Sequence, residues 1–350
     1  MYFDIEVKEK KEDFYGHEKE YLMLKSAVNE GRKLIVIKGV RRVGKSSLMR
    51  VIYREFGSPA VWVDGRIARQ NWQDLLEQTM RELWRQLDIK NAAITVLSSV
   101  SIGPITITKD KQTKALEKIS EELNNELKGR KLMARIFIDE AQLIKDLAAP
   151  IAYIYDHMSN IQFILSGSEV GVLEKFVGSE SDAPLFGRLK EEIKVDRMQP
   201  ESAREYLKTG SLQSGKEIPE YEINDTITQL DGLIGWLTYY GYLRRNHGHK
   251  EALAVLINDA QSIVRAELDE FLRCVKGNKK RYIQILKIVA TGPKSWAEIK
   301  KGVELYERKT ISSGRINDYL AALSDYSFIV KNQEQYTLAD PIMHLVCRKY

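Results

Sequence analysis

Residues 34–51 read LIVIKGVRRVGKSSLMRV, and this stretch decides the fold of the chain. Its middle part matches the pattern G-x-x-x-x-G-K-[ST] at every fixed position. An apolar run enters the pattern and a helix-like run leaves it, which favours a phosphate-binding loop over a chance turn. The two arginines inside the loop either add positive charge to a site or are solvated. The predicted nucleotide-binding residues of the loop are Gly39, Val40, Arg41, Arg42, Val43, Gly44, Lys45, Ser46 and Ser47.

The fixed positions of this loop each have a physical reason. Gly39 and Gly44 allow backbone geometry that a Cβ atom would obstruct, so successive N–H groups can turn toward phosphate oxygens. Lys45 can reach the β- and γ-phosphates as a compact charge and is predicted to act in catalysis. Ser46 offers its hydroxyl to Mg²⁺. The helix that begins here directs its positive dipole end at the anion.

A second apolar run, residues 136–138, ends in the carboxylates of Asp139 and Glu140. A buried parallel strand that ends in two acids places them at the carboxyl edge of the sheet, where open α/β folds bind ligands. Asp139 is predicted to bind the nucleotide and to hold Mg²⁺ directly or through water. Glu140 is predicted to orient and activate the water that attacks the γ-phosphate. The alternative is a strand that simply meets a solvated turn.

Three further predictions concern residues around this centre. Tyr15 either forms a wall against the adenine or only packs with Phe14 against the start of a helix. Ser166 and Ser168 follow another apolar run, and their hydroxyls either sense the γ-phosphate and the attacking water or cap the next helix. Arg188 is a candidate arginine finger, within the chain or across subunits, with a surface arginine as the alternative.

Composition limits the class of protein. The 350 residues are 43% hydrophobic and 29% charged, which is typical of a globular protein of two or three domains. The net charge of +5 is too small to indicate nucleic-acid binding from the total alone. Cys274 and Cys347 lie far apart without metal-type spacing, so we expect a reducing cytoplasm. Met1–Lys11 lacks a signal-type apolar core, and no run reaches the roughly 20 apolar residues of a membrane span.

Changes in pattern along the chain predict its domains. Strand and helix signals alternate up to about residue 195, which predicts an α/β fold with a mostly parallel sheet and helices on both faces. Only helical patterns follow, which predicts a small helical lid domain with a loop over 210–219. The last part predicts three helices, including 296–301 and 311–323, and a hairpin, as in a winged helix. A further hairpin is expected over 100–107. The predicted domains are 1–197, 198–276 and 277–350.

The predicted winged helix has two possible kinds of partner. Five polar residues gather at the start of its third helix, where such folds contact DNA. Two aspartates lie on the same helix, and many winged helices bind proteins instead, so DNA and protein both stay open. The polar residues are Lys309, Ser312, Ser313, Arg315 and Asn317, and the aspartates are Asp318 and Asp325.

These elements, in this order, resemble the archaeal ATPase family within the AAA+ and STAND group of P-loop ATPases. The resemblance covers about residues 12–275, and a winged helix is a common appendage of the group. Two residues depart from the family pattern: His17 stands where arginine is usual, and Trp236 where proline is usual. The resemblance implies that Arg188 is the arginine after the Phe-Gly pair and that the Gly235 segment faces the nucleotide. The matching stretches are residues 14–20, 39–47, 136–142, 165–168, 185–188 and 231–237.

The resemblance and the loop together predict a Mg²⁺-dependent ATPase that acts as a nucleotide-driven switch, with ATP or ADP between the sheet and the lid. The family implies ATP, and the base-reading Asn-Lys-x-Asp of GTPases is absent from the sequence. The main alternative is a nucleotide-binding scaffold or transcription regulator with little turnover. A kinase is less well supported, because no acceptor-binding lid is evident. The sequence leaves the oligomeric state open.

Overall fold

The structure is a computed structural model that describes residues 1–67, 72–87, 109–178, 181 and 183–350. The hairpin predicted over 100–107 lies outside the described residues. A first short 3₁₀ helix, η1 (Lys11–Asp13), leads into α1 (Glu18–Asn29). In the described ranges, no helix is both long enough and apolar enough to cross a lipid bilayer.

Among the described residues, the N-terminal part contains a sheet of five parallel strands in the order β2-β3-β4-β1-β5. Apolar residues dominate β1, β3 and β4 because both faces of the sheet are covered there, and every residue of β4 is buried, whereas the edge strand β5 is mostly charged. The predicted α/β class and mostly parallel sheet are therefore confirmed. The strands are β1 (Leu34–Lys38), β2 (Ala60–Asp64), β3 (Ala134–Asp139), β4 (Ile161–Gly167) and β5 (Glu191–Lys194).

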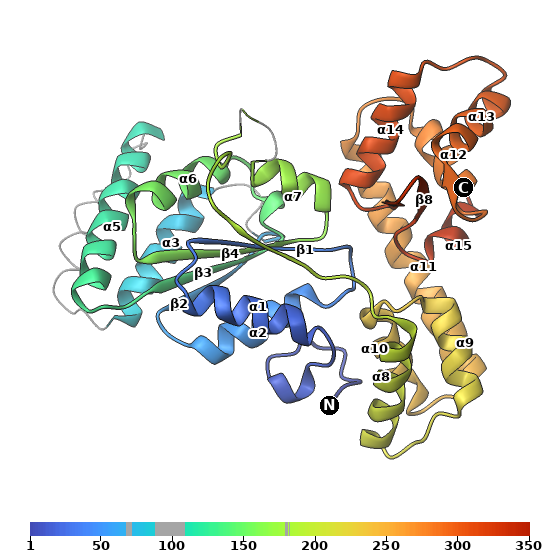
Figure 1. Ribbon diagram of the computed structural model, residues 1–350, viewed down its shortest axis with the longest axis horizontal. Coiled ribbons are helices and arrows are strands. Elements are labelled where there is room, and N and C mark those ends of the chain that lie inside the picture. Colours follow the sequence, from blue (N-terminus) through green and yellow to red (C-terminus); the bar gives the residue numbers. More distant parts are fainter. Residues whose placement is uncertain (68–71, 88–108, 179–180, 182) are drawn as a thin grey trace, which may run out of the picture.

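Alternate residues of β1, an interior strand of the sheet, enter two separate cores. In β1, Ile35 and Ile37 join the core beneath α1 and α2 (Lys45–Phe56), whereas Leu34 and Val36 join the core on the opposite face. Figure 1 shows these layers, with α1 and α2 below the sheet and α6 and α7 above it. The helices of the opposite face are α3 (Trp72–Gln86), α5 (Lys109–Gly129), α6 (Ala148–His157) and α7 (Val170–Phe176), and η2 (Ala141–Leu143) follows β3.

Four helices form the lid domain. They are α8 (Pro200–Gln213), α9 (Glu220–Leu230), α10 (Ile234–Arg244) and α11 (His249–Cys274). The loop predicted over 210–219 was wrong in its first part, because α8 continues to Gln213. Gly210 sits in this helix at a close contact: a Cβ atom there would lie 2.4 Å from the ring of Phe3. The glycine therefore marks a packing site for the N-terminus and not a turn.

The C-terminal part is a winged helix, as predicted. Its three-stranded antiparallel sheet has the order β6-β8-β7. Helix α13 runs to Glu307, beyond the predicted end, because the buried stripe of Ile299 continues to Val303. A short last helix was not predicted. The elements are α12 (Lys279–Val289), β6 (Lys294–Ser295), α13 (Trp296–Glu307), α14 (Ser313–Asp325), β7 (Ile329–Asn332), β8 (Gln335–Leu338) and α15 (Met343–Cys347).

The winged helix docks on the N-terminal part that contains the parallel sheet. The long helix α11 runs from the lid into the winged helix, as Figure 1 shows. At the other side, the backbone N–H of Val170 donates to Ser327 Oγ at 3.0 Å, and Lys175 pairs with Asp325 at 2.8 Å. The end of α14 therefore contacts α7. The predicted domain boundaries lie in the connections 195–199 and 275–278, and they stay predictions.

Candidate nucleotide-binding site

The phosphate loop joins the carboxyl end of β1 to the first turn of α2. Gly44 has a φ of +101°, in the region that favours glycine. A Cβ atom on Gly39 would lie 2.2 Å from the carbonyl oxygen of Val195, so a larger residue would collide with the backbone. The two glycines of the pattern therefore serve different needs. One permits a left-handed turn, and the other permits a close approach to the strand-end segment after β5.

Lys45 is buried inside this loop. Its Nζ donates to the carbonyl oxygen of Val40 at 2.8 Å, which uses one of three donors of the ammonium group. Burial lowers the pKa of Lys45 to about 8, although Glu140 and Asp139 oppose this shift. Val40 is the one hydrogen-bond partner of Nζ among the residues whose structure is described, and a buried cation with few partners is an incomplete arrangement, because burial of charge is costly. The lysine is thus suited to receive an anion.

Asp139 connects the loop to the neighbouring strands. Its side chain is 2% exposed, and its Oδ2 accepts a hydrogen bond from Ser46 Oγ at 2.8 Å. Its other oxygen accepts a hydrogen bond from the hydroxyl of Ser166, at the end of β4. Strand β4 lies between β1 and β3, so parallel pairing brings the three carboxyl ends together. Ser46 and Asp139 offer the hard oxygen donors that fit Mg²⁺.

Glu140 is held beside this centre in a left-handed backbone conformation, with a φ of +54°. One carboxylate oxygen accepts from the backbone N–H of Ser168 at 2.9 Å, from its hydroxyl at 3.0 Å and from Gln142 Nε2 at 2.7 Å. Burial acts to raise the pKa of Glu140, but the charge of Lys45 and these hydrogen bonds leave it below its usual value. The group is therefore ionised at neutral pH.

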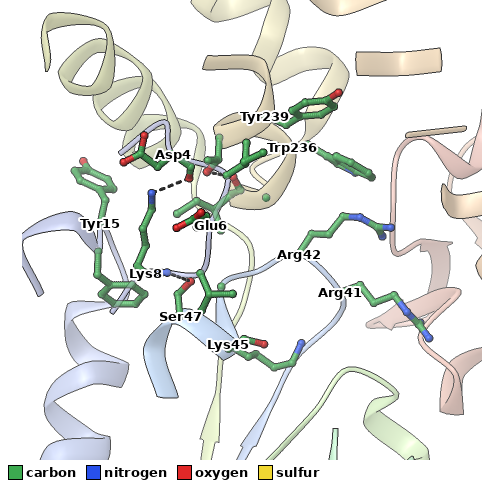
Figure 2. Close-up of a pocket in the computed structure, with 18 of the residues that line it drawn as sticks. Asp4, Glu6, Lys8, Tyr15, Arg41, Arg42, Lys45, Ser47, Trp236 and Tyr239 are labelled. Carbon is green, nitrogen blue, oxygen red and sulfur yellow. Dashed lines mark hydrogen bonds between the residues drawn. The ribbon is translucent and has the colours of Figure 1, made fainter. Parts of the chain in front are cut away.

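A cavity of about 440 Å³ extends from Lys45 and Ser46 along the lid. This volume is in the usual range for small-molecule sites. Tyr15 lines the cavity, and burial together with Glu205 raises its pKa to about 12. Figure 2 shows Tyr15 on one side of the pocket and Trp236 on the other. Sequence reasoning missed part of this lining, which no motif signals: Asp4, Ile5, Glu6, Val7, Lys8, Tyr206, Thr238 and Tyr239.

The two arginines of the loop are paired and not solvated. Arg41 bonds to Glu169 at 3.0 Å and to the carbonyl oxygen of Tyr326 at 3.0 Å. The Arg41 partners lie just before α7 and at the end of α14, so this side of the loop faces the winged helix. Both arginines also line the cavity, and in Figure 2 their side chains extend away from Lys45.

Arg42 makes the second set of contacts between the loop and the C-terminal part. It bonds to Glu267 at 2.7 Å and to Asp340 at 3.0 Å, in α11 and the winged helix respectively. Its guanidinium lies 4.3 Å from the ring centre of Trp236, whose Nε1 donates to the same Asp340 at 3.0 Å. The tryptophan that departs from the family pattern is therefore part of this contact.

The structure does not bring Arg188 to the site. The loop before β5 meets the sheet where the strands begin, because Glu191 pairs with Ile35 near the start of β1. Arg188 there bonds to Asp156, with 3.0 Å between Nε and Oδ1. The phosphate loop lies at the opposite edge. Within one chain, the predicted contact between this arginine and the phosphates therefore does not form in this arrangement.

The comparisons with known proteins agree with this geometry. The family model described as an AAA domain matches residues 31–207. The chain belongs to the AAA domain family. A second model, the winged helix-turn-helix domain at the C-terminus of MCM proteins, matches residues 276–339. The predicted resemblance to P-loop ATPases of this group with a winged helix is thus confirmed. No curated protein matches the sequence.

Solved structures extend the likeness of this AAA family member over nearly the whole chain. The Walker-type ATPase PABY2304 of Pyrococcus abyssi is 27% identical, with 99% of this chain and 100% of that one covered and a TM-score of 0.77. The ORC2 protein of Aeropyrum pernix, in ADPNP–ADP complexes, is 12% identical (99% and 96% covered, TM-score 0.59). Cdc6p from Pyrobaculum aerophilum is also 12% identical (99% and 96%, TM-score 0.50). The last two show a shared fold only.

Proposed function

We propose that the protein is a Mg²⁺-dependent ATPase that acts as a nucleotide-driven switch. The observation that carries this proposal is the convergence on Asp139 of one hydroxyl from the first turn of α2 and one from the end of β4, with a buried lysine beside it. Asp139 accepts from Ser46 and Ser166, and in the part of the chain that the structure describes Lys45 Nζ donates to Val40 alone. This set matches what a metal-bound triphosphate requires, namely oxygen ligands for the metal and a cation for the phosphates.

The roles follow from the chemistry of each group. The loop amides and Lys45 would bind the β- and γ-phosphates, and Ser46 and Asp139 would hold Mg²⁺. When bound there, Mg²⁺ would neutralise part of the charge that develops on the phosphates. Glu140 is ionised and orients the attacking water, and Ser168 and Gln142 fix the position of its carboxylate. Of the two nucleotides, ATP and not GTP is proposed from the family.

The switch itself depends on the other side of the loop. Because Arg41 and Arg42 bond to the winged helix and to α11, a change in the loop on binding or hydrolysis alters the contacts that dock the C-terminal part. Two discrete arrangements of these ion pairs would give two positions of the winged helix. The winged helix then passes the nucleotide state to DNA or to a partner protein.

One observation favours the second candidate, a nucleotide-binding regulator with little turnover. All three hydrogen bonds to Glu140 go to the same carboxylate oxygen, and Ser168 supplies two of them. A carboxylate held in this way is a weaker acceptor for a water proton than a free one. In such a regulator, binding of ATP alone would change the contacts of the winged helix.

Comparison of wild type with Glu140→Gln tests the proposal. We expect the variant to bind ATPγS with an affinity close to wild type while its turnover falls at least about 100-fold, as for loss of a general base. Glu191→Gln, at the far edge of the sheet, is the matched control and should keep full turnover. Equal turnover in wild type and Glu140→Gln, at the background level of Lys45→Ala, would favour the regulator without turnover.

A further inference from the structure

The first eight residues, here called the strap, are anchored at one end in the lid. Phe3 is 2% exposed, and a Cβ atom on Gly241 of α10 would lie 2.3 Å from its ring. With Gly210 of α8, this forms a notch that only glycines leave open. The anchor is reinforced by polar contacts: Tyr206 Oη donates to the carbonyl oxygen of Tyr2 at 2.9 Å, and Arg245 donates to the carbonyl oxygen of Phe3.

The other end of the strap is fixed to the helix that follows the phosphate loop. The backbone N–H of Lys8 donates to Ser47 Oγ at 3.1 Å, one residue after the Ser46 of the loop pattern. Just beyond it, Glu9 accepts two hydrogen bonds from Arg54 of α2, both at 2.9 Å. The strap thus spans from the lid to α2, and Figure 2 shows it passing between them at the pocket.

The middle of the strap has no such partners. The backbone N–H and C=O groups of Ile5, Glu6 and Val7 form no hydrogen bond with any residue in the described part of the chain. Ile5 is 60% exposed and Val7 49% exposed, so side-chain packing does not explain their position either. Yet these residues line the cavity that contains Lys45. A fixed segment with free backbone groups along a cavity is suited to bind a polar ligand.

The residues that line the cavity indicate which part of a bound nucleotide would contact the strap. The phosphates belong at the loop, so the rest of a nucleotide extends toward the aromatic lining formed by Tyr15, Tyr206 and Tyr239. We propose that the strap closes over the base and ribose of the bound nucleotide and retains it through the backbone groups of residues 5–7. This inference rests on the proposed function. It also makes the lid end of the strap a determinant of nucleotide release.

The direct test is Phe3→Ala, with Leu212→Ala as the matched control for loss of an apolar side chain that fills no notch and does not line the cavity; Leu212 lies in α8 and is 63% exposed. We expect Phe3→Ala to raise the Kd for ATPγS with Mg²⁺ about tenfold, mainly through faster release in stopped-flow measurements. Leu212→Ala should stay within about twofold of wild type, because its side chain is exposed and remote from the cavity. An unchanged Kd for ATPγS in Phe3→Ala would refute the proposal that the strap retains the nucleotide. A lower Kd would also refute it, and would mean that the segment obstructs the site.

Hydrogen exchange of the wild-type protein provides a second test that needs no variant. Addition of ATPγS and Mg²⁺ should slow exchange of the amides of residues 5–7, because they gain hydrogen-bond partners. Unchanged exchange of these amides, in a protein that binds ATPγS in a Lys45-dependent way, would refute the strap and leave the proposed function intact. Failure of the wild type to bind ATPγS at all would overturn both.

Discussion

The two faces of the phosphate loop differ in what they contact. The inner face, with Lys45 and Ser46, points to Asp139 and to residues of the same sheet edge. The outer face, with Arg41 and Arg42, is bound to α11 and to the winged helix, more than 220 residues later in the chain. One short loop therefore contacts both the place for the phosphates and the domain that would respond to them. From this difference we expect that separate substitutions can alter the binding of the nucleotide and the docking of the winged helix.

Removal of the inner charge should have the largest effect on nucleotide affinity. We expect Lys45→Ala to raise the Kd for ATPγS by more than about 100-fold, because hydrogen bonds to charged groups are lost at a buried site. Isothermal titration calorimetry measures this, with Lys19→Ala on the surface of α1 as the control. If the Kd of Lys45→Ala for ATPγS stayed within a few-fold of the wild-type value, the inner face of the loop would not be the phosphate-binding face.

Alkaline pH should weaken binding through the same side chain. The pKa of Lys45 is lowered to about 8 in the free protein, and the anion binds the protonated form. As pH rises above 8, the lysine must first gain a proton, so we expect the Kd for ATPγS to rise about tenfold between about pH 7 and pH 9. Lys45→Arg should lose this dependence, because a guanidinium stays protonated. A wild-type profile as flat as that of the variant would contradict the buried-lysine assignment.

Loss of an outer-face acid should separate docking from binding. In Asp340→Asn, Arg42 and Trp236 lose a charged acceptor whose side chain is 14% exposed. We expect the free energy of unfolding to fall by about 1–2 kcal/mol and small-angle scattering to report a looser winged helix. The Kd for ATPγS should change less than about threefold, since Lys45 and Asp139 are intact. Asp318→Asn, on the exposed side of α14, is the control. If Asp340→Asn lowered affinity as strongly as Lys45→Ala, the two faces would not be separable.

The smallest effect is expected at the far edge of the sheet. Arg188→Ala removes an ion pair with Asp156 that is remote from the loop. We expect an unchanged Kd for ATPγS and unchanged turnover in a dilute, single-chain preparation. Turnover that falls only at concentrations where chains associate would assign Arg188 to a neighbouring subunit's site. A loss of turnover in isolated chains would mean that the loop before β5 moves to the phosphates.

The inner face could be predicted from sequence because its geometry is local. Asp139 ends β3, and Lys45 and Ser46 begin α2 directly after the loop that follows β1, while parallel pairing brings the strand ends to one edge. The outer face could not be predicted, because the partners of Arg42 come from a docking arrangement that no periodicity encodes. The same holds for Phe3, whose notch becomes visible only when α8 and α10 pack together. In α8, Gly210 suggested a loop, but the helix continues through it to Gln213 because the glycine packs against Phe3.

The measurement that tests the central claim most directly is the Mg²⁺ dependence of ATPγS binding in wild type and in Asp139→Asn. We propose that Ser46 and Asp139 hold a metal ion on the same triphosphate that Lys45 binds. If so, the Kd of wild type for ATPγS should rise about tenfold or more when Mg²⁺ is replaced by EDTA. Asp139→Asn should bind with one Kd in both conditions. A variant that keeps the full response to Mg²⁺ would show that the metal is held elsewhere, and the proposed site would be wrong.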